Sequence, residues 1–412
     1  MDVVKISVCG AGRRGKSLCE FVFSVMKDVE VVAIADICIE RADELADMML
    51  EKTGKRPNTY INYADMFKAE TQDAVYIASD WKTHKEITIN AFRCNIAVAL
   101  EVGGEFTEAE WKELIAAYEK TKTPFMFMEN CCFGKVELFA TSLARNGVFG
   151  EIVYCHGAYM HDLRRLATHD GDGKGNFRLD KYCNDNCDAY PTHELGPIAK
   201  LLDINRGNRM VSLTSRSSKA CGLSDYIRRT EDVSHFAEMQ FLQGDIVETL
   251  ITCENGELIS IRYDTTLPCY YSREFNVRGT RGLYEEKLNL VLLDGWKDKY
   301  ENQAELLENA KKDSESFYDK YLPDVWKNIS EEALSSGHEG IDYLQFEAFF
   351  EALREGVDMP IDIYDAASWM SITYLSRKSI ELGGASVDIP DFTNGEYKTR
   401  LRRDVVEMPE IE

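Results

Sequence analysis

A short segment near the start of the chain, VVKISVCGAGRRG at residues 3–15, constrains the fold more than any other. An apolar run of strand length leads into a Gly-x-Gly-x-x-Gly pattern, and helical apolar spacing follows it. A second apolar run, VEVVAIAD at 29–36, ends at an acidic residue. Strand, helix and strand within about 35 residues form a parallel unit. The segment therefore predicts the first unit of a doubly wound parallel sheet.

The glycines of this segment have separate tasks in such a unit. Gly10 permits the tight turn, Gly12 lets the backbone approach a pyrophosphate, and Gly15 lets helix and strand pack closely. Asp36 suits ribose hydroxyls and repels a 2′-phosphate, which favours NAD over NADP. Arg41, one helical turn further on, keeps NADP possible, and a glycine turn without a ligand is the alternative. The predicted cofactor-binding residues are Gly10, Gly12, Arg13, Arg14, Gly15, Asp36 and Glu101.

The pattern of apolar and polar residues changes after about residue 130. Before it, apolar strands alternate with helical patterns; after it, longer alternating strands are separated by turn signals at Gly244-Asp245 and Asn255-Gly256. Such strands are typical of an antiparallel sheet with one solvated face. We therefore expect an α/β protein. A Rossmann dinucleotide-binding domain at 1–130 is followed at 131–412 by an α+β domain with a mostly antiparallel open sheet, a C-terminal helix and a tail.

Composition excludes several partners. The formal net charge of −23 disfavours nucleic acid, whose phosphates need a basic surface, and disfavours an anionic membrane. No apolar run reaches the roughly 20 residues of a spanning helix, and no signal peptide is recognisable. Twelve cysteines in such a chain read as reduced thiols. These features predict a cytoplasmic protein that acts on small molecules.

No metal site is predicted. The segment HDGDGKGNFRLD at 169–180 begins like a calcium loop, but lysines stand where the EF-hand needs an oxygen ligand and a glutamate. Cys183, Cys187 and His193 lack the usual spacing of structural zinc ligands. No pair of acidic residues stands out as a two-carboxylate glycosidase site either.

The segment DAYPTHELGP at 188–197 presents two proton-transfer side chains. Tyr190 and His193 lie three residues apart, with Pro191 between them and a helical pattern beginning near Pro197. An imidazole at a helix N-terminus feels the positive end of the dipole, which disfavours its protonated form. His193 is therefore a candidate proton acceptor; a simple helix cap is the alternative.

Several motifs, in order along nearly the whole chain, resemble those of one known family. They are EVGG at 101–104, MENCCFG at 128–134, GAYMHDLR at 157–164, NFR at 176–178, YPTHELGP at 190–197, INRG at 204–207, YDTTLPCYYSR at 263–273, GHEGIDY at 337–343, PIDIYDAASW at 360–369 and PDFTNGEYK at 390–398. With the N-terminal fingerprint, they resemble the Gfo/Idh/MocA oxidoreductases. The resemblance is closest to the branch of NAD-dependent glycosidases typified by bacterial α-N-acetylgalactosaminidase.

This resemblance implies a mechanism without net redox change. In such a glycosidase, tightly bound NAD is recycled as the sugar is oxidised at carbon 3, undergoes elimination, adds water and is reduced again. The catalytic residues implied are His193, Tyr271 and Tyr190. His193 would take the carbon-3 hydroxyl proton, and Tyr271 would act near carbons 1 and 2. The same three residues, together with Glu129 and Arg178, would bind the sugar.

The resemblance leaves alternatives open. Tyr270 stands beside Tyr271, for which a cross-strand aromatic residue is the alternative; a surface ion pair is the alternative for Glu129 and Arg178. A net sugar or polyol dehydrogenase and a non-catalytic sugar or NAD sensor are the other functions. Family dehydrogenases usually carry Glu-Lys-Pro where this chain has Glu101-Val102-Gly103, which favours the glycosidase. The family also commonly forms oligomers through the open sheet of the second domain, so a homo-oligomer is expected.

Overall fold

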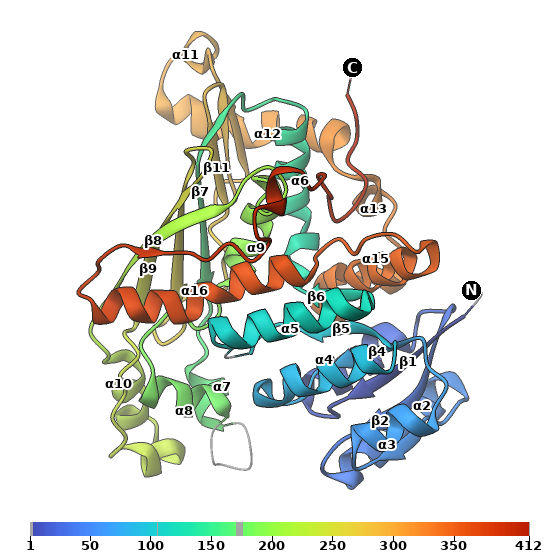
Figure 1. Cartoon of the computed structure of the whole chain (residues 1–412). Helices are drawn as coiled ribbons and strands as arrows, with labels where there is room; N and C mark the ends of the chain where they lie inside the picture. Colours follow the sequence, from blue (N-terminus) through green and yellow to red (C-terminus); the bar gives the residue numbers. More distant parts are fainter. Residues whose placement is uncertain (1–2, 105, 170–175, 412) are drawn as a thin grey trace. The chain divides into compact units, whose positions relative to one another are not determined.

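The apolar periodicity of the chain produces two compact units (Figure 1). The computed structural model describes residues 3–104, 106–169 and 176–411, so the glycine-rich segment 170–175 lies outside the described residues. The first unit comprises Met1–Gly134, Pro323–Ala367 and Arg403–Glu407; the second comprises Lys135–Leu322, Ser368–Arg402 and Met408–Glu412. Segment 323–367, predicted to belong to the C-terminal domain, is thus grouped with the N-terminal residues.

The first unit contains a parallel sheet of six strands in the order β3-β2-β1-β4-β5-β6. Every residue of β4 and β5 is buried, as expected for strands covered on both faces. The strands are β1 Val4–Cys9, β2 Val29–Ala35, β3 Asn58–Tyr60, β4 Ala74–Ile77, β5 Ala97–Glu101 and β6 Phe125–Met128. The order changes direction between β1 and β4, where ligands bind in doubly wound sheets.

Helices connect and flank these strands. The α-helices of the first unit are α1 Arg13–Leu18, α2 Ile39–Thr53, α3 Tyr63–Ala69, α4 His84–Arg93, α5 Glu108–Thr121, α13 Asp324–Lys327, α14 Glu331–Leu334 and α15 Ile341–Glu355. Shorter turns are η1 Cys19–Phe23, η2 Trp81–Thr83, η3 Asn130–Phe133 and η5 Gly337–Gly340. The predicted helix after the glycine pattern therefore continues beyond Leu18 as a π-helical turn, η1.

The second unit is built on an eight-stranded sheet in the order β13-β12-β11-β7-β10-β9-β8-β14. Its pairs are antiparallel except for β7 with β10. The strands are β7 Ile152–Met160, β8 Met210–Ser217, β9 Ile246–Cys253, β10 Leu258–Asp264, β11 Asn276–Gly279, β12 Gly282–Glu285, β13 Leu290–Leu293 and β14 Val387–Asp388. The mostly antiparallel sheet was predicted, and the Asn255-Gly256 turn joins β9 to β10.

One face of this sheet packs against helices, and the other is partly exposed. Gly157 on β7 leaves room for α9, since a Cβ there would lie 2.8 Å from the Glu194 carbonyl oxygen. The helices are α6 Lys135–Arg145, α7 Arg164–His169, α8 Phe177–Asn184, α9 Thr192–Leu201, α10 Gly222–Arg229, α11 Trp296–Lys299, α12 Gln303–Tyr321 and α16 Ile363–Glu381, with turns η4 Glu231–Phe236 and η6 Glu396–Lys398. The change of unit after residue 367 falls within α16. Among the described residues, no helix combines the length and apolar character needed to span a bilayer.

Candidate functional site

The glycine-rich turn in the first unit has the geometry that a dinucleotide requires. Gly10 has a φ of +104°, and a Cβ there would lie 2.6 Å from the Ala78 carbonyl oxygen at the end of β4. At Gly15 a Cβ would lie 2.0 Å from the Gly10 carbonyl oxygen. At Gly12, in contrast, a Cβ would meet nothing within 4 Å. Two glycines are therefore needed for packing, and the third leaves an open approach to the backbone, which fits NAD.

Asp36, at the carboxyl end of β2, is held beside this turn. Its Oδ2 accepts a hydrogen bond from the Ala11 N–H at 2.8 Å, and its Oδ1 accepts one from the Cys38 N–H at 2.9 Å. Arg41, which kept NADP possible, donates to Asp36 Oδ1 at 3.0 Å. The carboxylate is therefore fixed at the strand end where the family fold binds ribose.

The two predicted arginines differ in their surroundings. Arg13 is exposed, whereas Arg14 donates from Nε to Glu101 at 2.8 Å and from both Nη atoms to Asp342, each at 2.8 Å. Burial alone would lower the pKa of Arg14, but the two carboxylates raise it well above its ordinary value. The side chain of Arg14 is thus committed to these carboxylates.

These contacts belong to a larger cluster, which we call the Arg14 network. Asn130 donates from Nδ2 to Asp342 Oδ1 at 2.8 Å, and His338 Nδ1 lies 2.7 Å from Asp342 Oδ2. Burial alone would raise the pKa of Asp342, but Arg14 and His338 hold it well below its usual range. The network consists of Arg14, Tyr76, Glu101, Asn130, His338 and Asp342, with Tyr76 donating to Glu101. The sequence left His338 and Asp342 without a role, and no local pattern connected them to Arg14.

Residues 101–103, at the end of β5 and just after it, stand where family dehydrogenases carry Glu-Lys-Pro. Val102, in the place of the family lysine, is buried. Gly103 has a φ of +114°, and a Cβ there would lie 2.1 Å from the Trp81 indole. Trp81 thus packs directly on the Gly103 backbone at the carboxyl edge of the sheet. Trp81 was not predicted as a site residue, although a tryptophan just after a buried strand was a usable signal.

His84 follows Trp81 closely and is also buried. Its Nε2 lies 3.0 Å from the Ser79 carbonyl oxygen, and burial lowers its pKa to about 4. His84 is therefore neutral near pH 7. Glu129, predicted to bind sugar, is buried at the end of β6 and accepts a hydrogen bond from the Cys131 N–H at 3.0 Å. It is therefore not part of a surface ion pair.

The second unit gathers the other predicted site residues around Tyr159 on β7. The ring centroids of Tyr190 and His193 lie 5.2 and 5.3 Å from that of Tyr159, and 4.8 Å from each other. The Arg178 guanidinium lies 5.6 Å from the Tyr190 ring centroid, within cation–π range. Tyr159 was not predicted, although it belongs to the GAYMHDLR motif.

His193 is not the cap of its helix. The N-cap position of α9 is Pro191, and no side chain there forms a capping hydrogen bond. His193 lies in the first turn, with its ring edge-on to both Tyr159 and Tyr190. The capping alternative is therefore wrong for this histidine.

Tyr271 belongs to the same cluster, and Tyr270 does not share its contacts. The Tyr271 ring lies 6.4 Å from Tyr159 and 5.1 Å from His161, and Arg273 donates to the Tyr271 oxygen at 3.1 Å. Tyr270 is 60% exposed and has no such contact among the described residues. Tyr271 precedes Ser272, which forms an isolated antiparallel bridge with Met160 at the end of β7, so the Tyr271 ring packs across from that strand and aromatic packing stays the alternative to a proton-transfer role. His161 also reaches the cluster, with Nδ1 3.2 Å from the Tyr159 hydroxyl oxygen.

A buried carboxyl group, also missed from the sequence, stands just before the YPTH segment. Asp188 is fully buried, and its Oδ1 accepts a hydrogen bond from the Tyr190 N–H at 3.4 Å. Its Oδ2 has no hydrogen-bond partner within the described part of the chain. Burial raises the pKa of Asp188 to about 7. This carboxyl group therefore supports the backbone from which Tyr190 projects.

Comparison with known proteins matches two successive parts of the chain to known families. Residues 4–128 match the oxidoreductase family with an NAD-binding Rossmann fold, and residues 133–399 match the C-terminal domain of glycosyl hydrolase 109. The chain is 33% identical to a glycosyl hydrolase family 109 protein of Stenotrophomonas maltophilia, over 96% of this chain and 90% of that protein. It is 31% identical to an alpha-N-acetylgalactosaminidase of Tannerella forsythia, over 96% of this chain and 87% of that protein.

Solved structures share the fold at lower identity. A myo-inositol 2-dehydrogenase from Lactobacillus plantarum aligns with a TM-score of 0.62 and 16% identity, covering 94% of this chain and 100% of that one. A scyllo-inositol dehydrogenase from Lactobacillus casei, solved with NAD(H) and scyllo-inositol, aligns with a TM-score of 0.65 and 13% identity, covering 94% and 99%. The predicted fold class is confirmed. The chain belongs to glycosyl hydrolase family 109 and is an NAD-dependent glycosidase with an oxidoreductase fold.

Proposed function

We propose that the protein hydrolyses a small glycoside, an α-N-acetylgalactosaminide being the first candidate, while NAD stays bound throughout turnover. The observation that carries this proposal is the cluster of Tyr190, His193 and Tyr271 around Tyr159 in a chain that has an NAD-binding domain. The similarity to a relative named alpha-N-acetylgalactosaminidase supports the choice of sugar. The role would lie in carbohydrate metabolism.

In the proposed chemistry, each side chain either transfers a proton or forms a hydrogen bond with a hydroxyl group of the sugar. Bound NAD would supply reversible hydride transfer at sugar carbon 3. His193 would accept the carbon-3 hydroxyl proton, and Tyr190 would hydrogen-bond at the same position. Tyr271 would remove the proton from carbon 2, which becomes acidic beside a carbonyl group, so that the group on carbon 1 leaves. Glu129 and Arg178 would hold the remaining hydroxyl groups.

Other residues would hold the cofactor. The open backbone at Gly12 would meet the pyrophosphate, with Gly10 and Gly15 shaping the turn, and Asp36 would accept hydrogen bonds from the adenosine ribose. Arg13 would lie at the exposed mouth of this turn. Arg14 and Glu101 would contribute through the fixed geometry of their network. Val102 carries no transferable proton, which favours a glycosidase over a dehydrogenase.

Purified protein tests this proposal when it is assayed with a panel of chromogenic glycosides. We expect NAD to co-purify, because a cofactor recycled within each turnover gains nothing by leaving. Aglycone release should proceed with no accumulation of NADH absorbance. NADH rising in step with product would instead identify a net sugar dehydrogenase. Hydrolysis by protein shown to be free of nucleotide would contradict the NAD-dependent mechanism altogether.

We also propose that the protein is cytoplasmic and homo-oligomeric. All twelve cysteines are free thiols, and most are buried, which suits a reducing compartment. The exposed face of the second-unit sheet is the proposed contact between two copies. Leu250 and Leu258, 45% and 38% exposed, lie on this face on neighbouring strands.

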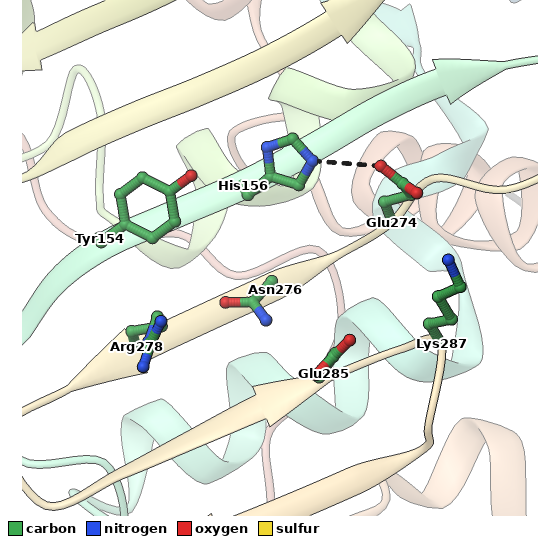
Figure 2. Close-up of a pocket in the computed structure, with 7 residues that line it drawn as sticks. All are labelled: Tyr154, His156, Glu274, Asn276, Arg278, Glu285 and Lys287. Atoms are coloured by element: carbon green, nitrogen blue, oxygen red, sulfur yellow. Dashed lines mark hydrogen bonds and ion pairs between the residues drawn. The ribbon is translucent and has the colours of Figure 1, made fainter.

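A polar hollow of about 270 Å³ on the same face supports a symmetric pairing (Figure 2). Glu274 pairs with Arg262 and contacts His156, but Arg278, Lys287 and Glu285 have no ion-pair partner among the described residues. The hollow is lined by Tyr154, His156, Glu274, Asn276, Arg278, Glu285 and Lys287. In a two-fold dimer the same patch faces itself, so its unpaired charges of opposite sign can meet across the axis.

The double variant Arg278→Glu, Lys287→Glu tests this contact. Removing both positive charges leaves only negative groups to face each other, so we expect the dimer to dissociate at micromolar concentration. Light scattering with size-exclusion chromatography measures the mass. Arg93→Glu, an exposed reversal in the first unit, is the control and should remain dimeric. A monomeric parent, or a dimeric double variant, would contradict the proposed surface.

A further inference from the structure

His338 stands out in the Arg14 network because only one of its two ring nitrogens contacts a hydrogen-bond partner among the described residues. Its Nδ1 contacts Asp342 Oδ2 at 2.7 Å, whereas its Nε2 has no hydrogen-bond partner within the described part of the chain. The His338 side chain is 61% exposed, and the Asp342 side chain is fully buried. A buried carboxylate thus holds an imidazole that presents its other nitrogen outward.

The contacts indicate which ring nitrogen of neutral His338 carries the proton. Nδ1 also lies 3.4 Å from Arg14 Nη1, but the contact with Asp342 is shorter. Asp342 accepts from both Nη atoms of Arg14 and from Asn130 as well. A proton on Nδ1 completes this set of donors, so Nδ1 donates to Asp342. In the neutral ring, Nε2 then carries the lone pair and accepts hydrogen bonds.

The backbone at His338 is also fixed in an uncommon conformation. His338, Glu339 and Gly340 have φ values of +52°, +57° and +97°. Gly337 leaves no room for a side chain, because a Cβ there would lie 2.5 Å from Asp342 Oδ2. Left-handed backbone at non-glycine residues costs stability and persists where the surroundings hold it in place. The segment is therefore built to place this imidazole at one position.

The position is the carboxyl edge of the parallel sheet. The network joins α1, the end of β5 and the turn after β6, through Arg14, Glu101 and Asn130. Asp36, at the end of β2, lies on the other side of β1 in the strand order. In this fold a dinucleotide crosses the edge, with its adenosine ribose at the second strand. His338 is thus on the side of the nicotinamide half.

Formal charge indicates which group of that half it meets. The network sets one guanidinium against two carboxylates, an excess of one negative charge. Acidic groups outnumber basic ones on the elements packed around His338, which carry Arg13, Arg14 and Lys16 on α1, Glu331 and Glu332 on α14, the neighbour Glu339, and Asp342, Glu347, Glu351, Arg354 and Glu355 on α15. This negative excess disfavours a phosphate oxygen and favours a hydroxyl donor.

We propose that His338 is a cofactor-contact residue whose Nε2 accepts a hydrogen bond from a hydroxyl of the nicotinamide ribose of NAD, with Asp342 as the positioning residue that orients the ring. The inference rests on the placement of NAD proposed above. It assigns a role to the GHEGIDY segment, which lies more than 300 residues after the glycine-rich turn.

Calorimetric titration of the full chain, stripped of its co-purified nucleotide and checked by absorbance to be free of it, tests the proposal with NAD, ADP-ribose and ADP. His338→Asn is the chosen variant, because asparagine tolerates left-handed backbone. We expect its dissociation constants for NAD and ADP-ribose to rise about tenfold, the scale of one hydrogen bond, and that for ADP to stay unchanged. Glu339→Ala, in the same left-handed segment, is the control and should bind all three ligands like the parent.

The ligands separate the possible failures. Unchanged affinity of His338→Asn for ADP-ribose would overturn the proposal, and an equal loss for ADP would show a phosphate contact instead. Thermal unfolding without nucleotide checks whether the variant is folded. If His338→Asn melts well below Glu339→Ala, its lost affinity for NAD and ADP-ribose supports the contact only when ADP binding is retained. Loss of affinity for all three ligands would overturn the proposal. A parent that binds ADP and ADP-ribose but not NAD would contradict the proposed function rather than this contact.

Discussion

Replacing His193 by alanine is expected to reduce glycoside turnover by about 10²- to 10⁴-fold, the range for losing a general acid or base. The reason is that the carbon-3 hydroxyl proton must leave as the carbon is oxidised, and His193 is the proposed acceptor. The ring contacts of His193 with Tyr159 and Tyr190 place it among polar aromatic groups rather than in a capping role. Initial rates on a chromogenic glycoside measure the effect.

The NAD content of His193→Ala should match that of the parent, since the predicted cofactor-binding residues all lie in the first unit. His235→Ala, which removes an exposed histidine of the second unit, is the matched control and should keep full activity. Near-parental turnover by His193→Ala would remove this residue from the mechanism. Circular dichroism establishes that the variant is folded.

Tyr271→Phe should slow product formation by about 10²-fold or more, because it keeps the ring and removes only the hydroxyl group. Arg273 donates to that hydroxyl oxygen at 3.1 Å and would stabilise negative charge there. A packing role alone would leave the rate almost unchanged. The rate of aglycone release, with substrate in excess, measures the effect.

Tyr270→Phe is the control, since Tyr270 precedes Tyr271 and is 60% exposed. It should keep the parental rate. If Tyr270→Phe were slow and Tyr271→Phe normal, the assignment of the two tyrosines would be reversed. If both variants were normal, a tyrosine at this position would have no part in proton transfer.

The sequence predicted best where structure depends on local pattern. The glycine-rich turn, Asp36 at the end of β2 and the alternation of strands and helices all follow from residues close together in the chain. The β9–β10 hairpin follows from the Asn255-Gly256 turn in the same way. Such features need only short-range periodicity and turn chemistry.

Contacts between residues far apart in the chain could not be predicted from local pattern in this way. Arg14 was predicted as a cofactor residue, but its side chain pairs with Asp342, and a salt bridge 328 residues apart in sequence has no local signature. Tyr159 looked like one more alternating residue of a strand. Only the register of β7 and the placement of α9 make it the centre of the aromatic cluster.

Isotope exchange at sugar carbon 2 tests the central claim most directly. Hydrolysis in heavy water, followed by mass spectrometry and NMR of the released sugar, should show deuterium at carbon 2, because the proposed elimination removes that proton and water addition replaces it. A net dehydrogenase would leave the position unlabelled and accumulate NADH with product. Hydrolysis that yields sugar without deuterium at carbon 2 would contradict the elimination mechanism proposed for Tyr271 and His193.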